Sequence, residues 1–316
     1  MARKKQINYK SIFPAICIPF NADYSIDEDN LRKYARWLAT FEEIGGLVCN
    51  GHTGEITSLR LAERRRAVEI VADEVGDQVM VLSGINCEGT LEAVDHVKEM
   101  KKAGADAILL MPPHMWLRFG MNPRSPIEYF RKVSEASDMG IIIHLYPHIT
   151  KAFYPVETVI ELSKIPTVKA LKIGTRNMPL YERDIRILRE KAPNLAILTC
   201  HDESLLSSMF PGVDGALIGF AGCIPELISD AWKAMKAGNL AEIRRYDSLL
   251  APLAEAIYGI GQPSGEAHAR MKEMLYQRGV YKSALMREPV LPISQEEKNT
   301  VSAALAKSNV PKVSLN

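Results

Sequence analysis

A strand–helix–strand unit stands out in residues 141–173, which read IIIHLYPHITKAFYPVETVIELSKIPTVKALKI. Residues 141–145 and 168–173 are short apolar runs that contain β-branched side chains, which is typical of buried strands. Residues 156–163 between them are expected to form a helix. Because two strands joined through a helix lie parallel in one sheet, this stretch predicts an α/β fold.

The same alternation runs from residue 12 to residue 237. Eight strand–helix units in about 225 residues fit a (β/α)8 TIM barrel better than an open doubly wound sheet. The Gly-x-Gly-x-x-Gly motif of dinucleotide-binding sheets is also absent after the first strand. The barrel is assigned to residues 10–237, and residues 238–316 are expected to be a C-terminal helical extension packed on it in the same structural unit. The expected strands are 12–19, 46–49, 79–83, 107–111, 141–145, 168–173, 195–199 and 215–219, and the expected helices are 27–40, 61–75, 90–103, 126–139, 156–163, 179–191, 203–210 and 225–237.

Composition and charge exclude several classes of protein. The 316 residues include 39 Lys and Arg against 38 Asp and Glu, and this balance predicts no nucleic-acid partner. No apolar run reaches the roughly 18 residues that a membrane span needs. Pro14 and Pro19 interrupt the first apolar run, which favours a core strand over a signal peptide. Five cysteines without CxxC spacing indicate reduced thiols in a cytoplasmic protein.

The second expected strand is followed by a loop that reads NGHTGE, residues 50–55. Two glycines flank His52 and Thr53, so backbone N–H groups can approach a ligand closely, and such a nest suits a carboxylate or a phosphate. A plain turn into the next helix is the alternative. Because the chemistry of a TIM barrel lies on the loops after the strands, this loop is a candidate binding site.

Lys172 lies at the end of the sixth expected strand. A period of two places Lys172 on one face with Val168 and Ala170, and a barrel strand is covered on both faces. A desolvated lysine has a lowered pKa, and its free amine can attack a ketone to form a Schiff base. The alternative is a lysine whose charged end reaches solvent at the strand end.

Histidines also gather at the strand ends. Imidazoles there can move protons or bind a metal. A zinc hydrolase would carry His-x-His near the end of the first strand, where this chain has Cys17-Ile18-Pro19. Metal binding is therefore the less favoured role. The histidines at or just past strands are His52, His114, His144, His148 and His201, whereas His96 and His268 are expected on helices.

These features together resemble the dihydrodipicolinate synthase / N-acetylneuraminate lyase family over residues 10 to 300. The resemblance rests on residues 14–20, residues 51–55, Pro112-Pro113, Tyr146-Pro147 and Lys172. It implies a barrel with a C-terminal helical extension and a class I lyase without metal or other cofactor. Such lyases act on pyruvate-like 2-oxo acids through a lysine Schiff base. The resemblance also implies a homotetramer, built as a dimer of dimers.

The resemblance assigns roles to individual residues. Lys172 matches the Schiff-base lysine, and Thr53 with its neighbouring amides matches the group that holds the carboxylate of the 2-oxo acid. The register anchored on Pro147 puts His144 where the family carries a proton-transferring tyrosine, and Tyr146 takes that place after a local shift. The expected catalytic residues are Lys172, His144 and Tyr146, and the expected substrate-binding residues are His52, Thr53, Gly54, His114, His201 and Ile218.

Two departures from the synthases of this family indicate a different reaction. The arginine that synthases place after the proline of strand five is missing from residues 147–150, and Ile173 replaces the glutamate that commonly follows the lysine. The lysine-biosynthesis synthase is therefore not expected, whereas aldol cleavage, condensation or dehydration is. Two alternatives stay open: a metal-dependent barrel hydrolase that uses the histidines, and a barrel that binds a sugar acid without turning it over.

Overall fold

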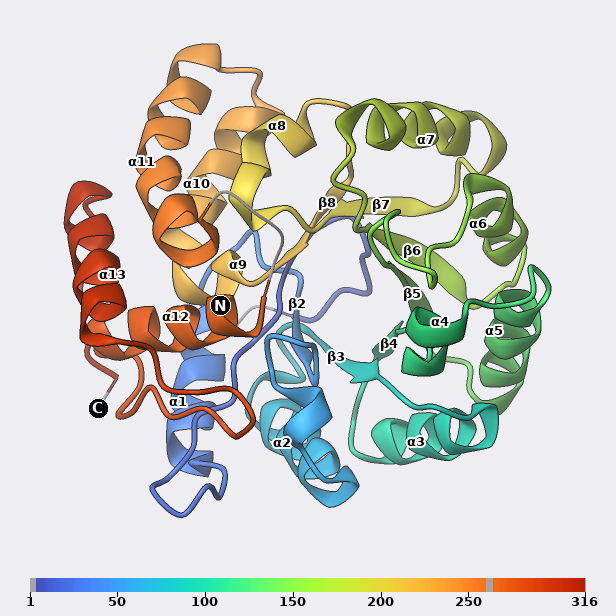
Figure 1. Ribbon diagram of the computed structural model, residues 1–316, viewed down its shortest axis with the longest axis horizontal. Helices are drawn as coiled ribbons and strands as arrows, with labels where there is room; N and C mark the ends of the chain where they lie inside the picture. Colours follow the sequence, from blue (N-terminus) through green and yellow to red (C-terminus); the bar gives the residue numbers. More distant parts are fainter. Residues whose placement is uncertain (1–3, 260–263, 316) are drawn as a thin grey trace.

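The computed structural model describes residues 4–259 and 264–315. Its eight strands form one parallel sheet in the order β1-β8-β7-β6-β5-β4-β3-β2. Isolated bridges from Ile12 to Ile44 and from Ala15 to Val48 join β1 to β2. The sheet is therefore a nearly closed barrel, and helices surround it (Figure 1). The predicted (β/α)8 fold is confirmed.

Strands and helices alternate through the barrel. The strands are β1 (Ile12–Pro14), β2 (Gly46–Cys49), β3 (Met80–Ile85), β4 (Ala107–Leu110), β5 (Gly140–Leu145), β6 (Val168–Ile173), β7 (Ala196–Thr199) and β8 (Gly215–Ile218). The helices are α1 (Glu28–Ala39), α2 (Leu61–Val75), α3 (Thr90–Lys102), α4 (His114–Phe119), α5 (Ser125–Ala136), α6 (Val156–Ser163), α7 (Met178–Lys191), α8 (Leu205–Met209), α9 (Phe220–Cys223) and α10 (Pro225–Lys236). Two short 3-10 helices, η1 (Ile56–Ser58) and η2 (Asp202–Ser204), follow β2 and β7.

The first strand is shorter than predicted. It ends at Pro14, because proline has no N–H and the ladder toward β2 lacks a donor there, although the next two amides still pair with the neighbouring strands. The amide of Ala15 donates to Ile218 of β8, and that of Ile16 donates to Val48 of β2. The helix predicted at 203–210 is divided between η2 and α8, and the short helices α4 and α9 were not predicted.

Side chains on each strand alternate between the barrel interior and the surrounding helices. One buried cluster takes at least one residue from every strand and fills the barrel. On β6 this cluster includes Ala170, whereas Leu171 and Ile173 pack in the second cluster, between sheet and helices. Because side chains alternate with a period of two, Lys172 shares the interior face with Ala170, as predicted. Val168, predicted on the same face, packs instead in the second cluster, where the pairing of β5 with β6 shifts register.

The C-terminal extension comprises α11 (Leu240–Tyr258), α12 (Gly265–Gln277) and α13 (Gln295–Lys307). Figure 1 shows these helices together on one side of the barrel, with α12 next to α9. The helix α11 ends at Gly259, which has a positive φ of 63°. Across the described ranges, the structure has no helix that is both long and apolar enough to cross a membrane.

Candidate active site

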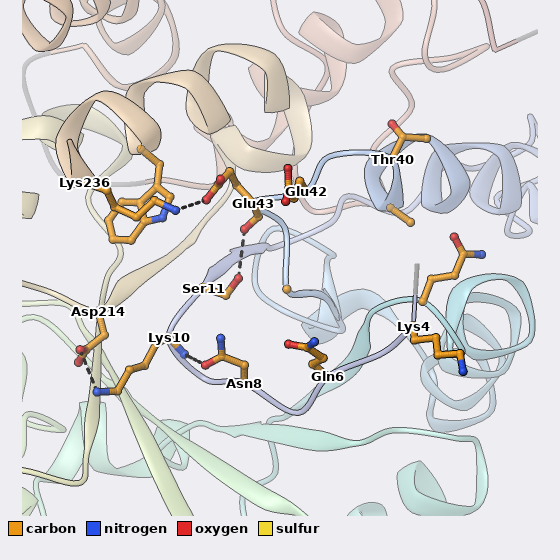
Figure 2. Close-up of a pocket in the computed structure, with 14 residues that line it drawn as sticks. Lys4, Gln6, Asn8, Lys10, Ser11, Thr40, Glu42, Glu43, Asp214 and Lys236 are labelled. Carbon is orange, nitrogen blue, oxygen red and sulfur yellow. Dashed lines mark hydrogen bonds and ion pairs between the residues drawn. The ribbon is translucent and has the colours of Figure 1, made fainter. Parts of the chain in front are cut away.

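Two cavities lie at opposite ends of the barrel. One, of about 520 Å³, is lined by residues at the carboxyl ends of β2, β5, β6, β7 and β8 and by residues of the extension. The other, of about 950 Å³, lies at the amino ends, beside Ser11, Gly45 and Asp214 (Figure 2). The catalytic residues of TIM barrels lie at the carboxyl ends of the strands. The smaller cavity is therefore the candidate active site.

The larger cavity has charged side chains that pair with one another. The ammonium group of Lys236 lies 2.6 Å from a carboxylate oxygen of Glu43, and that of Lys10 lies 3.4 Å from Asp214 (Figure 2). These pairs neutralise part of the charge along the wall. Of the described residues that line this cavity, none is a predicted site residue.

Lys172 opens into the smaller cavity from the end of β6. It aligns with His144 on β5 and with Leu198 on β7. Its ammonium nitrogen makes no hydrogen bond or ion pair with any residue in the ranges 4–259 and 264–315. Burial is the main cause that lowers the pKa of Lys172; Arg176 acts in the same direction, and Cys200 and Asp202 oppose them only in part. The lowered pKa favours the free amine that attacks a carbonyl carbon.

Histidine and tyrosine rings gather beside Lys172. The ring centres of His52 and His144 lie 5.4 Å apart, and those of His144 and Tyr146 lie 5.0 Å apart. The hydroxyl of Tyr146 lies 3.1 Å from Nε2 of His52, within hydrogen-bond distance. His114 stacks on His52 at 6.3 Å but is not part of the cavity wall. The structure therefore brings His52, His144 and Tyr146 together at the cavity, with His114 behind them.

The two imidazoles nearest Lys172 are held neutral. Burial lowers the pKa of His52 to about 3 and that of His144 well below its ordinary 6.5. The charge of Lys172 acts in the same direction on both rings. The buried Nδ1 of His144 has no hydrogen-bond partner in the described part of the chain. A neutral ring with a free nitrogen can accept a proton from a bound ligand.

The loop after β2 forms a tight turn with Thr53 at the cavity wall. The amides of Gly54 and Ile56 donate to the carbonyl of Gly51, and that of Glu55 donates to the carbonyl of His52. The amides of His52 and Thr53 have no acceptor among residues 4–259 and 264–315. These two N–H groups and the Thr53 hydroxyl are thus available to a ligand.

Gly54 plays a different part from the one predicted. Its amide is used within the turn, and a Cβ atom there would lie 2.9 Å from the carbonyl oxygen of Ile16. Gly54 is not part of the cavity wall. The glycine allows a close approach between this turn and the segment after β1, and it offers no free donor to the cavity.

His201 also lies away from the cavity, whereas Ile218 lines it. On β7 the interior residues are Ala196 and Leu198. The period of two therefore carries Cys200 into the cavity and turns His201 outward, where its ring lies 5.0 Å from that of Tyr181. The strand period, applied to β7, would have selected Cys200.

Arg176, Asp202, Tyr258 and His268 also line the cavity and were not predicted. The Nε atom of Arg176 donates to Glu203 at 2.8 Å, and Asp202 accepts from the hydroxyl of Tyr258 at 2.7 Å. Arg176 is close enough to β6 to have been considered from the sequence. His268 enters from α12, and no feature of the sequence places that helix over the cavity.

Replacement of His201 by phenylalanine tests this placement. Burial lowers the pKa of His201 to about 3, so below pH 6.5 the unfolded chain binds a proton that the folded chain does not. The free energy of unfolding then falls as pH falls, by up to about 1.4 kcal/mol per pH unit for this ring. We expect urea unfolding of His201→Phe to depend less steeply on pH between 6.5 and 4. A pH dependence equal to that of the wild type would contradict the buried placement of His201.

Metal binding receives no support from the geometry. Within the described ranges, no three His, Cys, Asp or Glu side chains are placed to hold one metal ion. His52, His144 and Tyr146 instead bring two imidazoles and a phenol together, and this set is suited to proton transfer.

Comparison with known proteins decides the family. The model of the dihydrodipicolinate synthetase family matches residues 8–308. The chain belongs to this family. A 4-hydroxy-tetrahydrodipicolinate synthase from Methanothrix thermoacetophila is 31% identical over 300 residues, which cover 95% of this chain and 97% of that protein. Another from Chlorobaculum parvum is 30% identical over 292 residues, which cover 92% and 94%.

Solved structures of the dihydrodipicolinate synthetase family share the fold. A prophage protein from E. coli K12, solved in complex with pyruvate, has a TM-score of 0.87 at 21% identity and covers 96% of this chain and 99% of its own. A monomeric dihydrodipicolinate synthase variant has a TM-score of 0.86 at 20% identity, with coverages of 96% and 100%. Membership confirms the predicted resemblance and makes the chain a lyase-family enzyme. The relatives are named as synthases, so these comparisons do not exclude the synthase reaction, which was not expected from the sequence.

Proposed function

We propose that this chain is a class I lyase that forms a Schiff base between Lys172 and a pyruvate-like 2-oxo acid. One observation carries the proposal: Lys172 opens into the cavity from the barrel interior, and burial favours its free amine. The amine attacks the carbonyl carbon, and loss of water leaves an imine. The imine withdraws electrons from the neighbouring carbon, where a bond can then form or break.

The surrounding groups divide the remaining work. The Thr53 hydroxyl and the amides of His52 and Thr53 bind the carboxylate of the 2-oxo acid. His144, aligned with Lys172 across β5 and β6, accepts and returns the proton at the carbon beside the imine. The Tyr146 hydroxyl forms a hydrogen bond with Nε2 of His52 and orients that ring. His114 stacks on His52 from outside the cavity wall and supports the same ring.

We further propose aldol cleavage, condensation or dehydration as the reaction, rather than the synthase reaction. The segment 147–150 lacks the arginine expected of a synthase. The names of the relatives support the opposite choice. Incubation with pyruvate and the aldehyde partner of 4-hydroxy-tetrahydrodipicolinate synthase decides between them, because product formation at a physiological rate would assign this chain to the synthases.

Borohydride trapping tests the Schiff base directly. The protein is incubated with pyruvate, reduced with borohydride, digested and weighed by mass spectrometry. We expect a reduced pyruvate adduct on the peptide that carries Lys172. A pyruvate-induced thermal shift without any adduct would favour the non-catalytic alternative, and a stoichiometric transition metal would favour the hydrolase alternative.

Replacement of Thr53 by valine tests the carboxylate site. Valine keeps the shape of threonine and removes the hydroxyl. Because a hydrogen bond to a charged group contributes about 1.5–3 kcal/mol, we expect half-saturation by pyruvate to need about 10- to 100-fold more pyruvate. Thr57→Val is the matched control, since exposed Thr57 also lines the cavity. Equal effects of the two variants would contradict the assignment.

We also propose that the enzyme is a cytoplasmic homotetramer, arranged as a dimer of dimers. The solved structures of similar fold include a monomeric variant, so assembly varies among them. Light scattering on the purified protein measures the mass in solution, and the mass of a single chain would contradict the tetramer.

A further inference from the structure

A buried ion pair joins the C-terminal extension to the loop after β2. The ammonium nitrogen of Lys272, on α12, lies 2.5 Å from a carboxylate oxygen of Glu55. The side chains are 1% and 4% exposed. The same nitrogen donates to the carbonyl of Leu285 at 2.7 Å and lies 4.1 Å from the ring centre of Phe20. Lys272 is therefore fixed from three sides.

The other oxygen of Glu55 is also held by the extension. It accepts the backbone amide of Arg287 at 2.9 Å. The Arg287 side chain donates to the carbonyl of Ser58 at 3.0 Å and pairs with Glu63 at 2.6 Å. Residues of the extension thus contact the loop at Glu55 and, through the Arg287 side chain, contact Ser58 and Glu63 after it.

Glu55 controls the shape of the turn that contains Thr53. Its φ is 56°, in the left-handed region that a residue with a side chain adopts only when its surroundings impose it. Its amide donates to the carbonyl of His52, across Thr53. Release of the Glu55 carboxylate would therefore let the turn relax and would move the two free amides and the Thr53 hydroxyl.

The helix that carries Lys272 also reaches the cavity. His268 lies four residues before Lys272, on the same side of α12, and lines the cavity wall. One helix of the extension, α12, therefore contacts both the cavity, through His268, and the loop that contains Thr53, through Lys272.

We propose that Lys272 is a positioning residue for the carboxylate site: through Glu55, the C-terminal extension sets the geometry of the turn at Thr53. This inference rests on the proposed function, because it takes that turn as the site of the 2-oxo acid's carboxylate. Lys272 acts through Glu55: Glu55 lines the cavity and Lys272 does not, so Lys272→Met tests positioning without changing a residue of the cavity wall.

The test compares Lys272→Met and Glu55→Gln with wild type in borohydride trapping over a range of pyruvate concentrations. A displacement of about 1 Å can lower activity about 100-fold, so we expect the half-saturating pyruvate concentration to rise about 10- to 100-fold. Adduct yield at saturation should match wild type, because Lys172 is unchanged. Glu55→Gln nearly keeps the side-chain shape and the acceptor for Arg287, so it provides a folded variant where Lys272→Met does not fold.

Arg278→Met is the control for a general loosening of the extension. Arg278 is 1% exposed and pairs with Glu226 of α10 at 2.7 Å, away from the loop. We expect Arg278→Met to lower the melting temperature without changing half-saturation. The inference would be overturned if Lys272→Met and Glu55→Gln both kept the wild-type half-saturating pyruvate concentration, or if Arg278→Met raised that concentration equally.

The two proposals fail in different ways. Absence of an adduct in the wild-type protein refutes the Schiff base alone. Calorimetric Kd values for pyruvate, measured on the same four proteins, then test the positioning of the carboxylate site without covalent chemistry. If wild-type protein does not bind pyruvate, both proposals are overturned.

Discussion

Replacement of Lys172 by alanine is expected to abolish the borohydride adduct with pyruvate. The exchange of pyruvate methyl protons with deuterated water, followed by NMR, should fall to background, because loss of a covalent nucleophile lowers turnover on the order of 10⁶-fold. The ammonium nitrogen of Lys172 has no hydrogen bond or ion pair in the described ranges. Its removal leaves no buried polar group without a hydrogen-bond partner, so the variant should fold.

Lys169 supplies the matched control for this experiment. It lies on the same strand, β6, three residues before Lys172, and its side chain is exposed. Lys169→Ala should keep the adduct and the exchange rate of the wild type. An adduct that persists in Lys172→Ala and disappears in Lys169→Ala would assign the Schiff base to Lys169 and contradict the assignment to Lys172.

Replacement of His144 by glutamine is expected to slow methyl-proton exchange about 10²- to 10⁴-fold, the range for loss of a general acid–base. The adduct should still form at saturating pyruvate, because the amine that forms it is intact. Tyr146→Phe should slow exchange only about tenfold, since it removes one hydrogen bond to His52. Both rates are measured by NMR on the same preparation.

The ratio of these two effects separates the candidates on β5. If Tyr146→Phe is the slower variant, the tyrosine is the proton-transferring residue and His144 shapes its surroundings. The alignment of His144 with Lys172 across β5 and β6 favours His144 as the proton-transferring residue, with His144→Gln the slower variant.

The sequence predicted the barrel well where local pattern and burial agree. The bounds of β2, β6, α2 and α6 match the expected residues, because each combines a clear period with boundaries marked by turn residues. Lys172 was placed on the correct face for the same reason. The prediction of the first strand failed at Pro14, where local apolarity continues but proline has no N–H to donate to the ladder.

The site was predicted less completely than the fold, because part of it depends on tertiary contacts. His201 was chosen for its chemistry, although the period of β7 turns it outward and brings Cys200 to the cavity. Arg176 lies beyond a strand end, where no periodic rule applies. His268 belongs to a helix whose position over the barrel is fixed only by packing of the extension.

The pair of Glu55 and Lys272 has a consequence for how the enzyme is made. The loop that contains Glu55 leaves the ribosome well before α12, with the strands β3 to β8 between them. Domains generally fold as units during synthesis, yet the buried carboxylate of this loop meets its counter-ion only after all eight strands have been translated. A nascent chain that stops at α10 would contain all eight strands and Lys172, but the Glu55 carboxylate beside Thr53 would still lack its counter-ion.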